Sequence, residues 1–214
     1  MAVRIEQRPT QAERRERSRS ALLESAARGL SRHGYARLNL EQVAREAGYT
    51  RGALYHQFED KQALALAVIQ WVDESWRAEV GPLIDRESEP VGALLAMARG
   101  HAVFCRRDVA RVVMALRLEF SGQEHPVGQE IERVSKSGLK RVAKLIQAGR
   151  REGSIPPGPP AMTVAAAFVG ALEGAVIAVA GRVPDDERLA ARAAAGVLGI
   201  DPSTRSEQLP KGHG

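Results

Sequence analysis

The chain has 214 residues, of which 44% are hydrophobic and 27% are charged, with a net charge of +5; this balance excludes a wholly disordered chain and is typical of a globular protein with a buried core. A single cysteine, Cys105, excludes an internal disulfide framework and any metal site built from several cysteines. The first twenty residues are charged and lack the apolar run of a secretory signal, so a cytoplasmic location is expected.

Apolar residues recur at helical spacing along most of the chain without strand alternation, which predicts an all-α protein. The first predicted helix covers residues 11–33. The second is capped by Asn39 and ended by Gly48, and a short third helix is capped by Thr50. A fourth, longer helix capped by Asp60 is expected to break at residues 81–82, because these are Gly and Pro.

Beyond that break, helices are expected after Pro90 and after Asp108, and further helices are predicted over residues 126–151, 161–180 and 185–198. The domain boundary is placed within the fourth helix. Three ranges follow: a first helical domain over residues 1–62, a second helical domain over residues 63–200, and a disordered polar tail over residues 201–214.

Two short helices joined by a glycine-containing turn and braced by a first helix are the pattern of a DNA-binding helix-turn-helix, although a helical hairpin that only packs has the same spacing. The charge distribution favours DNA. Residues 1–61 hold 12 Lys/Arg and 8 Asp/Glu, whereas residues 62–214 hold 19 and 18. A basic module joined to a nearly neutral body is the electrostatic pattern of polyanion binding.

The second helix of such a unit enters the major groove, so its exposed residues are the candidate DNA contacts. Arg51 is expected to pair with a guanine or a phosphate, and Tyr55 and His56 with phosphates or sugars. Lys61 adds a cation beside a helix N-terminus that already attracts anions. The predicted DNA-binding residues are Asn39, Thr50, Arg51, Gly52, Tyr55, His56 and Lys61.

The Arg-rich start of the first helix has two readings. It either tracks the DNA backbone or the neighbouring minor groove, or it is a solvated helix face that only steers association. The residues concerned are Arg14, Arg15, Arg17 and Arg19.

The segment YARLNLEQVAREAGYTRGALYHQFEDKQAL, residues 35–64, resembles the DNA-binding segment of the tetracycline repressor (TetR) family. Asn39 and Leu40 depart from the usual Thr-Thr or Thr-Val. His56 precedes Gln57 where many relatives have His second, which leaves open which of the two contacts DNA. The matching positions are Gly34, Tyr35, Val43, Ala44, Ala47, Gly48, Thr50, Gly52, Leu54, Tyr55, Phe58, Lys61 and Leu64.

The resemblance implies that residues 1–62 form a helix-turn-helix DNA-binding domain and that residues 63–200 form an all-α effector-binding and dimerisation domain. In the homodimer, the last two long helices of each copy form a four-helix bundle with those of the partner. It also implies that the small molecule releases the protein from its operator DNA. The predicted function is therefore a homodimeric transcriptional repressor on a partly palindromic operator. The alternative is a helical DNA-binding protein without a small-molecule effector, acting in chromosome organisation or protein recruitment.

Residues 161–181 carry a single charge, so a membrane span is a further alternative, with a cytosolic DNA-binding head. Glu173 lies just past the middle of this stretch, and no basic flank or aromatic belt marks an end. These features favour a helix that faces its own core on one side and a partner copy on the other. The predicted interface residues are the small ones, Ala167, Gly170, Ala171, Gly174 and Ala178.

Apolar residues of the second domain are candidates for lining a ligand cavity, although apolar residues at helical spacing more often pack in the hydrophobic core. His101, Glu119 and Glu173 are expected to make core hydrogen bonds or salt bridges. Cys105 is expected to be a buried core residue. The alternative is a redox sensor, because the neighbouring Arg106 and Arg107 could lower the pKa of its thiol. The candidate cavity residues are Trp71, Met97, His101, Phe104, Met114, Phe120 and Phe168.

No metal-ligand spacing, glycine-rich phosphate loop or nucleophile motif occurs in the sequence. We therefore expect no metal, no cofactor and no enzymatic activity. The expected partners are double-stranded operator DNA, a second copy of the chain and a small-molecule effector.

Overall fold

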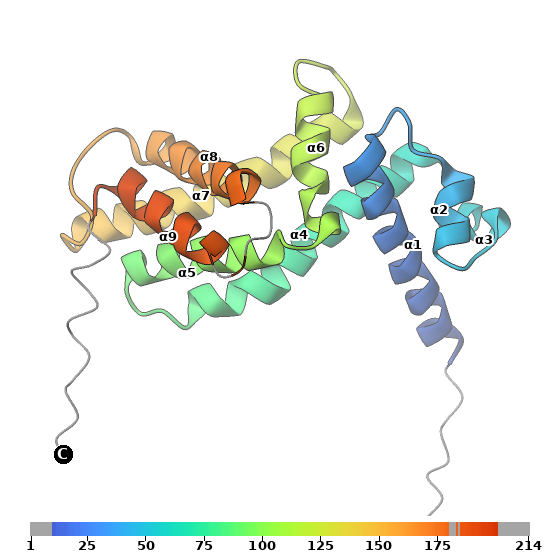
Figure 1. Ribbon diagram of the computed structural model, residues 1–214, viewed down its shortest axis with the longest axis horizontal. Coiled ribbons are helices and arrows are strands. Elements are labelled where there is room, and N and C mark those ends of the chain that lie inside the picture. The colour runs from blue at the N-terminus through green and yellow to red at the C-terminus, as the bar shows by residue number, and fades with distance from the viewer. Residues whose placement is uncertain (1–9, 180–182, 184, 201–214) are drawn as a thin grey trace, which may run out of the picture. The chain divides into compact units, whose positions relative to one another are not determined.

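The computed structural model describes residues 10–179, 183 and 185–200 (Figure 1). Every regular element in this part of the chain is a helix, which confirms the all-α prediction. The chain divides into two compact units. The first contains the residues up to Val72 together with 111–131, and the second contains 73–110 and the residues from Glu132 onward. The predicted tail, 201–214, lies outside the described residues.

The first unit is built around three helices whose starts are fixed by local capping. Thr10 begins the first of them with a capping box, in which its hydroxyl accepts from the Glu13 N–H and its own N–H donates to the Glu13 carboxylate. The elements of this unit are α1 (Gln11–His33), α2 (Leu40–Glu46), α3 (Arg51–Tyr55), the start of α4 (Lys61–Asp85), α6 (Val112–Glu119) and the start of α7 (Pro126–Arg151).

Packing in the first unit follows the apolar stripes of these helices. α2 packs against both α1 and α3, and α6 packs against α1. The hydroxyl of Ser25, which is fully buried, donates to the Val43 carbonyl at 3.0 Å and so ties α1 to α2. The largest fully buried side chains here include Leu22, Leu30, Leu54, Leu64 and Val68.

The predicted break of the fourth helix at residues 81–82 is wrong, because α4 continues to Asp85 with Pro82 inside it. Proline removes one backbone donor and strains the preceding turn. The flanking side chains Val80 and Ile84 are 1% and 4% exposed, so their burial holds the last turn in helical form. The segment after Asp108 also differs from a single helix: a 3₁₀ turn, η1 (Asp108–Arg111), precedes α6.

The division into units also differs from the predicted ranges. The break falls inside α4, between Val72 and Asp73, and residues 111–131 belong with α1, α2 and α3 rather than with the second unit. The physical reason is that α6 packs against α1, a contact between segments far apart in the sequence.

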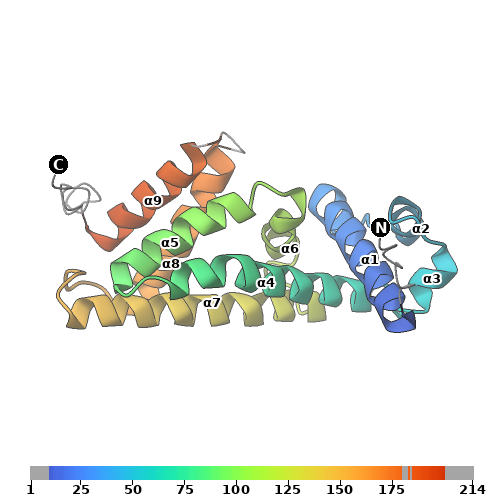
Figure 2. The same cartoon turned by 90° about the horizontal axis from the view of Figure 1, so that it is seen from below.

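The second unit contains α5 (Pro90–Phe104), α8 (Ala161–Val179) and α9 (Asp185–Leu198), with the remainders of α4 and α7. α9 packs against both α5 and α8, as Figure 2 shows. Gly100 permits a close approach of α5 to α4, because a Cβ at this position would lie 2.9 Å from the Val80 side chain. The fully buried side chains include Leu94, Ile146, Phe168 and Ala194.

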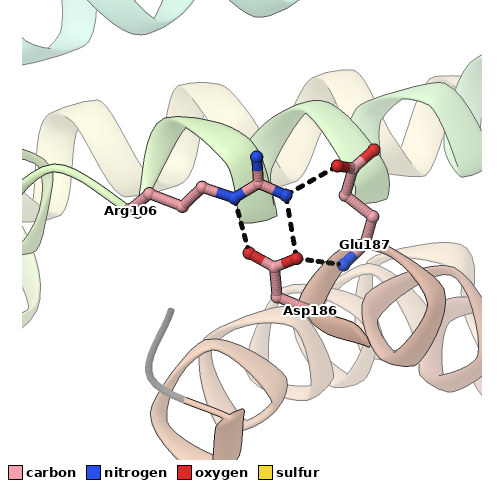
Figure 3. Close-up of polar contacts among 3 residues, drawn as sticks. All are labelled: Arg106, Asp186 and Glu187. Atoms are coloured by element: carbon pink, nitrogen blue, oxygen red, sulfur yellow. Dashed lines mark hydrogen bonds and ion pairs between the residues drawn. The ribbon is translucent and has the colours of Figure 1, made fainter. Parts of the chain in front are cut away.

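Arg106, two residues beyond the end of α5, forms ion pairs with two carboxylates at the start of α9 (Figure 3). Arg106 Nε donates to Asp186 Oδ2 at 2.7 Å, and Arg106 Nη2 donates to Asp186 Oδ1 at 2.9 Å and to Glu187 Oε1 at 2.6 Å. Asp186 is only 3% exposed, and the hydrogen bonds from Arg106 lower its pKa. This bidentate geometry fixes the first turn of α9.

α8 keeps one apolar face open in the single chain. By length and composition it is able to cross a membrane, with a mean hydropathy of 2.0, and only 28% of this stretch is buried. Gly170 and Gly174 lie on the open face, where an added Cβ would meet no atom within 4 Å. Ala167 and Ala178 are exposed beside them, and Ala171 is half-buried.

Candidate nucleic-acid interface

α3 presents one buried and one exposed face. Thr50 caps it by accepting from the Ala53 N–H at 3.2 Å, as its position in the sequence predicts. Leu54 and Phe58, at 0% and 3% exposure, anchor α3 and the residues just after it to the core. The exposed residues are Arg51, Gly52, Tyr55 and His56.

Arg51 and Tyr55 form a pair one helical turn apart on this exposed face. The Arg51 guanidinium carbon lies 5.3 Å from the centre of the Tyr55 ring, and Arg51 Nη2 lies 3.5 Å from the phenol oxygen. The hydrogen bond with Tyr55 raises the pKa of Arg51 above a value at which arginine is already fully charged at neutral pH. A cation held over a ring and still open to solvent is suited to a phosphate or a guanine edge.

His56 and Gln57, between which the sequence did not decide, have different surroundings. Gln57 is half-buried, and its Nε2 donates to Ser18 Oγ on α1 at 2.8 Å. His56 is exposed. Beside this contact, the Arg19 guanidinium lies 4.8 Å from the centre of the Phe58 ring. α1 therefore holds Gln57, and His56 is the freer of the two side chains.

The arginines at the start of α1 differ in how far they are exposed. Arg19 is half-buried through its contact with Phe58. Arg14, Arg15 and Arg17 are exposed, as both readings of this segment require.

Asn39 and Lys61 are both predicted to contact DNA, and both side chains also make hydrogen bonds to backbone groups of their own chain. Asn39 Oδ1 accepts from the N–H groups of Glu41 and Gln42 at 2.9 and 3.1 Å, which caps α2. Lys61 Nζ donates to the Ala36 carbonyl at 2.9 Å. Both side chains therefore have a structural role besides any contact with DNA.

Sequence reasoning missed the part that Glu119 takes in this region. It lies on α6, and its carboxylate accepts from the N–H groups of Tyr35 and Ala36, in the turn between α1 and α2, at 2.6 and 2.8 Å. A hydrogen-bonding role for Glu119 was expected, but its partner was not. These residues are more than 80 positions apart, and no local pattern pairs them.

The candidate cavity residues do not gather in one compact unit. Trp71, Met114 and Phe120 lie in the first unit, and Phe120 stacks on His125 with ring centres 4.5 Å apart. The other four lie in the second unit, namely Met97, His101, Phe104 and Phe168.

His101 is the polar member of the second group. Its Nδ1 lies 3.2 Å from the Trp76 indole nitrogen, and its Nε2 lies 3.5 Å from Cys105 Sγ. Burial lowers the pKa of His101 to about 4. Cys105 is itself 4% exposed, as expected of a core residue. Across the described part of the chain, no cluster of three His, Cys, Asp or Glu side chains is suited to hold a metal ion.

A short exposed helix, seated on a second short helix and braced by a third, defines a helix-turn-helix DNA-binding protein with an additional helical unit. Residues 22–68 match the family described as bacterial regulatory proteins, tetR family. This match covers α2 and α3, so this segment of the chain is similar to the bacterial regulatory proteins of the tetR family.

Two relatives illustrate the range of similarity. The A-factor receptor protein of Streptomyces griseus is 26% identical over 157 residues, which cover 72% of this chain and 52% of that protein. The match thus spans about half the length of that relative. The uncharacterized HTH-type transcriptional regulator YfiR of Bacillus subtilis is 23% identical over 170 residues, covering 77% and 80%.

Solved structures share the fold at low sequence identity. AibR in complex with isovaleryl coenzyme A and operator DNA aligns with a TM-score of 0.68 and 20% identity, covering 86% of this chain and 100% of that one. The fatty acid degradation regulator FadR from Bacillus halodurans aligns with a TM-score of 0.71 and 17% identity, covering 84% and 97%.

Proposed function

We propose that this protein is a DNA-binding transcriptional regulator of the tetR family. It acts as a homodimeric repressor that binds a partly palindromic operator through residues 50–61 of each subunit and is released by a small molecule. The exposed face of α3 carries the proposal. Arg51, Tyr55 and His56 are solvent-facing there, while Leu54 and Phe58 fix the backbone beneath them.

The proposed role of each side chain on DNA follows from its position on α3 or at the start of α4. Arg51, at the first turn of α3, is placed to meet a base edge or a phosphate, with Tyr55 limiting its rotation. His56 and Lys61 are assigned to phosphates on the same side, where α4 begins. Two such faces in a dimer would read half-sites about 34 to 36 Å apart, or a multiple of that distance.

The open face of α8 supports the homodimer. Met162 and Ile177 are 46% and 67% exposed in the single chain, and the small residues between them leave room for a second backbone. Exposed apolar surface of this kind marks an interaction site. Its proposed occupant is the same helix of a second copy, which would bury Gly170 and Gly174 at the centre of the interface.

A small-molecule effector is supported by analogy with a solved structure of similar fold. AibR has been solved with isovaleryl coenzyme A and operator DNA together. We assign the ligand of this chain to the second unit, among Met97, His101, Phe104 and Phe168. A ligand releases the protein only if it binds the DNA-free conformation more tightly than the DNA-bound one.

The first test is titration of a labelled duplex from the DNA flanking this protein's own gene, beside a scrambled duplex, at several salt concentrations. The proposal predicts tight, sequence-dependent binding with a steep salt dependence. Equal binding of the two duplexes would favour the alternative of an architectural DNA-binding protein. An operator affinity that every bound small molecule leaves unchanged would contradict the ligand-release part.

A matched pair of substitutions tests the face. His56→Ala should weaken operator binding several-fold with unchanged helicity. Gln57→Ala should weaken it less, because Gln57 is held by Ser18. Unchanged affinity in both variants, together with Tyr55→Ala, would show that another surface meets DNA.

A further inference from the structure

The turn between α1 and α2 is held from α6 by a single carboxylate. Both oxygens of Glu119 are used: Oε2 accepts from the Tyr35 N–H at 2.6 Å, and Oε1 accepts from the Ala36 N–H at 2.8 Å. Successive backbone amides that point at one anion form a strong binding concavity. The turn follows the C-terminus of α1, the negative end of the helix dipole, so the two N–H donors offset an otherwise unfavourable place for a carboxylate.

Gly34 makes this contact possible in two ways. Its φ is +74°, in the left-handed region that favours glycine. A Cβ at this position would lie 2.6 Å from Glu119 Oε2, which is closer than such atoms approach. The glycine therefore leaves room for the carboxylate in addition to ending α1.

Lys61 holds the other side of the same turn. Its Nζ donates to the Ala36 carbonyl at 2.9 Å and lies 4.8 Å from the centre of the Tyr35 ring. Ala36 is therefore bound by an anion at its N–H and by a cation at its carbonyl. The Tyr35 ring packs edge-on against Phe120 and His125, with centres 5.3 Å apart in each case.

The ammonium of Lys61 retains donors for DNA. A lysine has three N–H donors, and the Ala36 carbonyl takes one of them. Anchoring a long flexible side chain in advance lowers the entropy lost when it binds a phosphate.

We propose that Glu119 is a positioning residue for operator binding: through the turn at residues 34–36 it places Lys61 at the phosphate-facing start of α4. α6 thereby contributes to DNA affinity without touching DNA. This inference rests on the proposed function, since it takes Lys61 as a phosphate contact.

The test compares Glu119→Gln with Glu124→Gln in the full-length protein. The control removes the same charge from an exposed side chain five positions further on. Glu119→Gln places an amide donor against a backbone donor, so the turn loses at least one hydrogen bond. We expect operator affinity to fall roughly fivefold to tenfold, and the salt dependence to become shallower by about 0.9 for each phosphate that is no longer neutralised. Glu124→Gln should leave both unchanged.

Two further readouts separate positioning from simple destabilisation. Hydrogen exchange at the Tyr35 and Ala36 amides should be faster in Glu119→Gln and unchanged in Glu124→Gln. Lys61→Gln should weaken operator binding in the wild-type background and have little further effect in the Glu119→Gln background, because both changes remove the same interaction with DNA. Should Glu119→Gln fail to fold, Glu119→Asp, which keeps the charge and shortens the reach, takes its place with the same expectations.

The outcomes distinguish the two proposals. A wild-type protein that binds its operator no better than scrambled DNA would remove the proposed function and this inference with it. Specific binding by the wild type, with Glu119→Gln equal to Glu124→Gln in affinity and salt dependence, would overturn this inference alone. So would an undiminished effect of Lys61→Gln in the Glu119→Gln background, or unchanged exchange at the two amides.

Discussion

The indole N–H of Trp76 donates to Nδ1 of His101 at 3.2 Å. This bond occupies the lone pair that a proton would need and leaves Nε2 to carry the ring hydrogen, facing Cys105 Sγ at 3.5 Å. Together with burial, which lowers the pKa of His101 to about 4, the contact keeps the ring neutral near neutral pH.

Acid should therefore destabilise the second unit before its carboxylates titrate. The unfolded histidine has a pKa of about 6.5, so the unfolded state binds a proton that the folded state does not, and stability falls as pH drops from about 6.5 towards 4. We expect His101 to account for a loss of about 2 kcal/mol in the free energy of unfolding between pH 7 and pH 5. Urea denaturation at both pH values measures it. His101→Gln should flatten the dependence, and the exposed His56→Gln should not; equal slopes in all three proteins would refute the assignment.

The fork at Arg106 gives a prediction on the stability of the second unit. Asp186→Asn removes the charge that balances the guanidinium at a site that is nearly closed to solvent, and it should lower the thermal midpoint by several degrees. Because the pKa of Asp186 is lowered in the folded state, the stability it contributes is present at neutral pH and is lost only on acidification below its unfolded pKa of 3.8. Asp185→Asn, on the exposed neighbour, is the control, and an equal effect of the two would contradict the argument.

Two glycines with nearly the same φ should respond differently to alanine. Gly34 and Gly48 have φ of +74° and +78°, and a Cβ at Gly48 would meet no atom within 4 Å. Gly48→Ala should cost about 1 kcal/mol for the backbone conformation alone. Gly34→Ala should cost clearly more, because the new methyl group displaces Glu119. Denaturant titration compares them, and replacing Glu119 by Ala should remove the excess; an equal cost at both positions would mean that the carboxylate moves away freely.

The proposed dimer interface can be tested by introducing a large side chain on the open face of α8. A Cβ at Gly174 would meet no atom of its own subunit within 4 Å, so in Gly174→Leu the fold should survive while dimers dissociate and operator affinity falls. Gly138→Leu is the matched control, because Gly138 is exposed on α7 with equally open surroundings. Sedimentation velocity without detergent reports the oligomeric state. A wild-type chain that needs detergent to stay in solution would instead support the membrane reading of α8.

Features that depend on neighbours in the sequence were predictable from it. The helix starts at Asn39, Thr50 and Asp60 depend on side chains that reach backbone N–H groups two or three residues ahead, and the structure has all three of these caps. The inward placement of Leu54 and Phe58 likewise follows from their spacing of one helical turn.

Features that depend on distant packing were not predictable. Pro82 stays helical because Val80 and Ile84 are buried by other elements, which no local pattern shows. Apolar character groups most of the candidate cavity residues, but it does not show which unit each one belongs to. Phe120 packs against Tyr35 and His125 in the first unit. Sequence spacing gives the face of a helix, but not the element that covers that face.

The division of the chain within α4 decides how the protein can be dissected. Residues 111–131 belong to the same compact unit as α1, and the unit boundary lies inside a helix rather than in a linker. A fragment cut after Val72 would lack α6 and therefore Glu119, baring the α1 surface that α6 covers. A stable fragment of the first unit must therefore include α6 as a second, non-contiguous segment. The same holds for a chimera that joins this unit to the effector-binding domain of another protein.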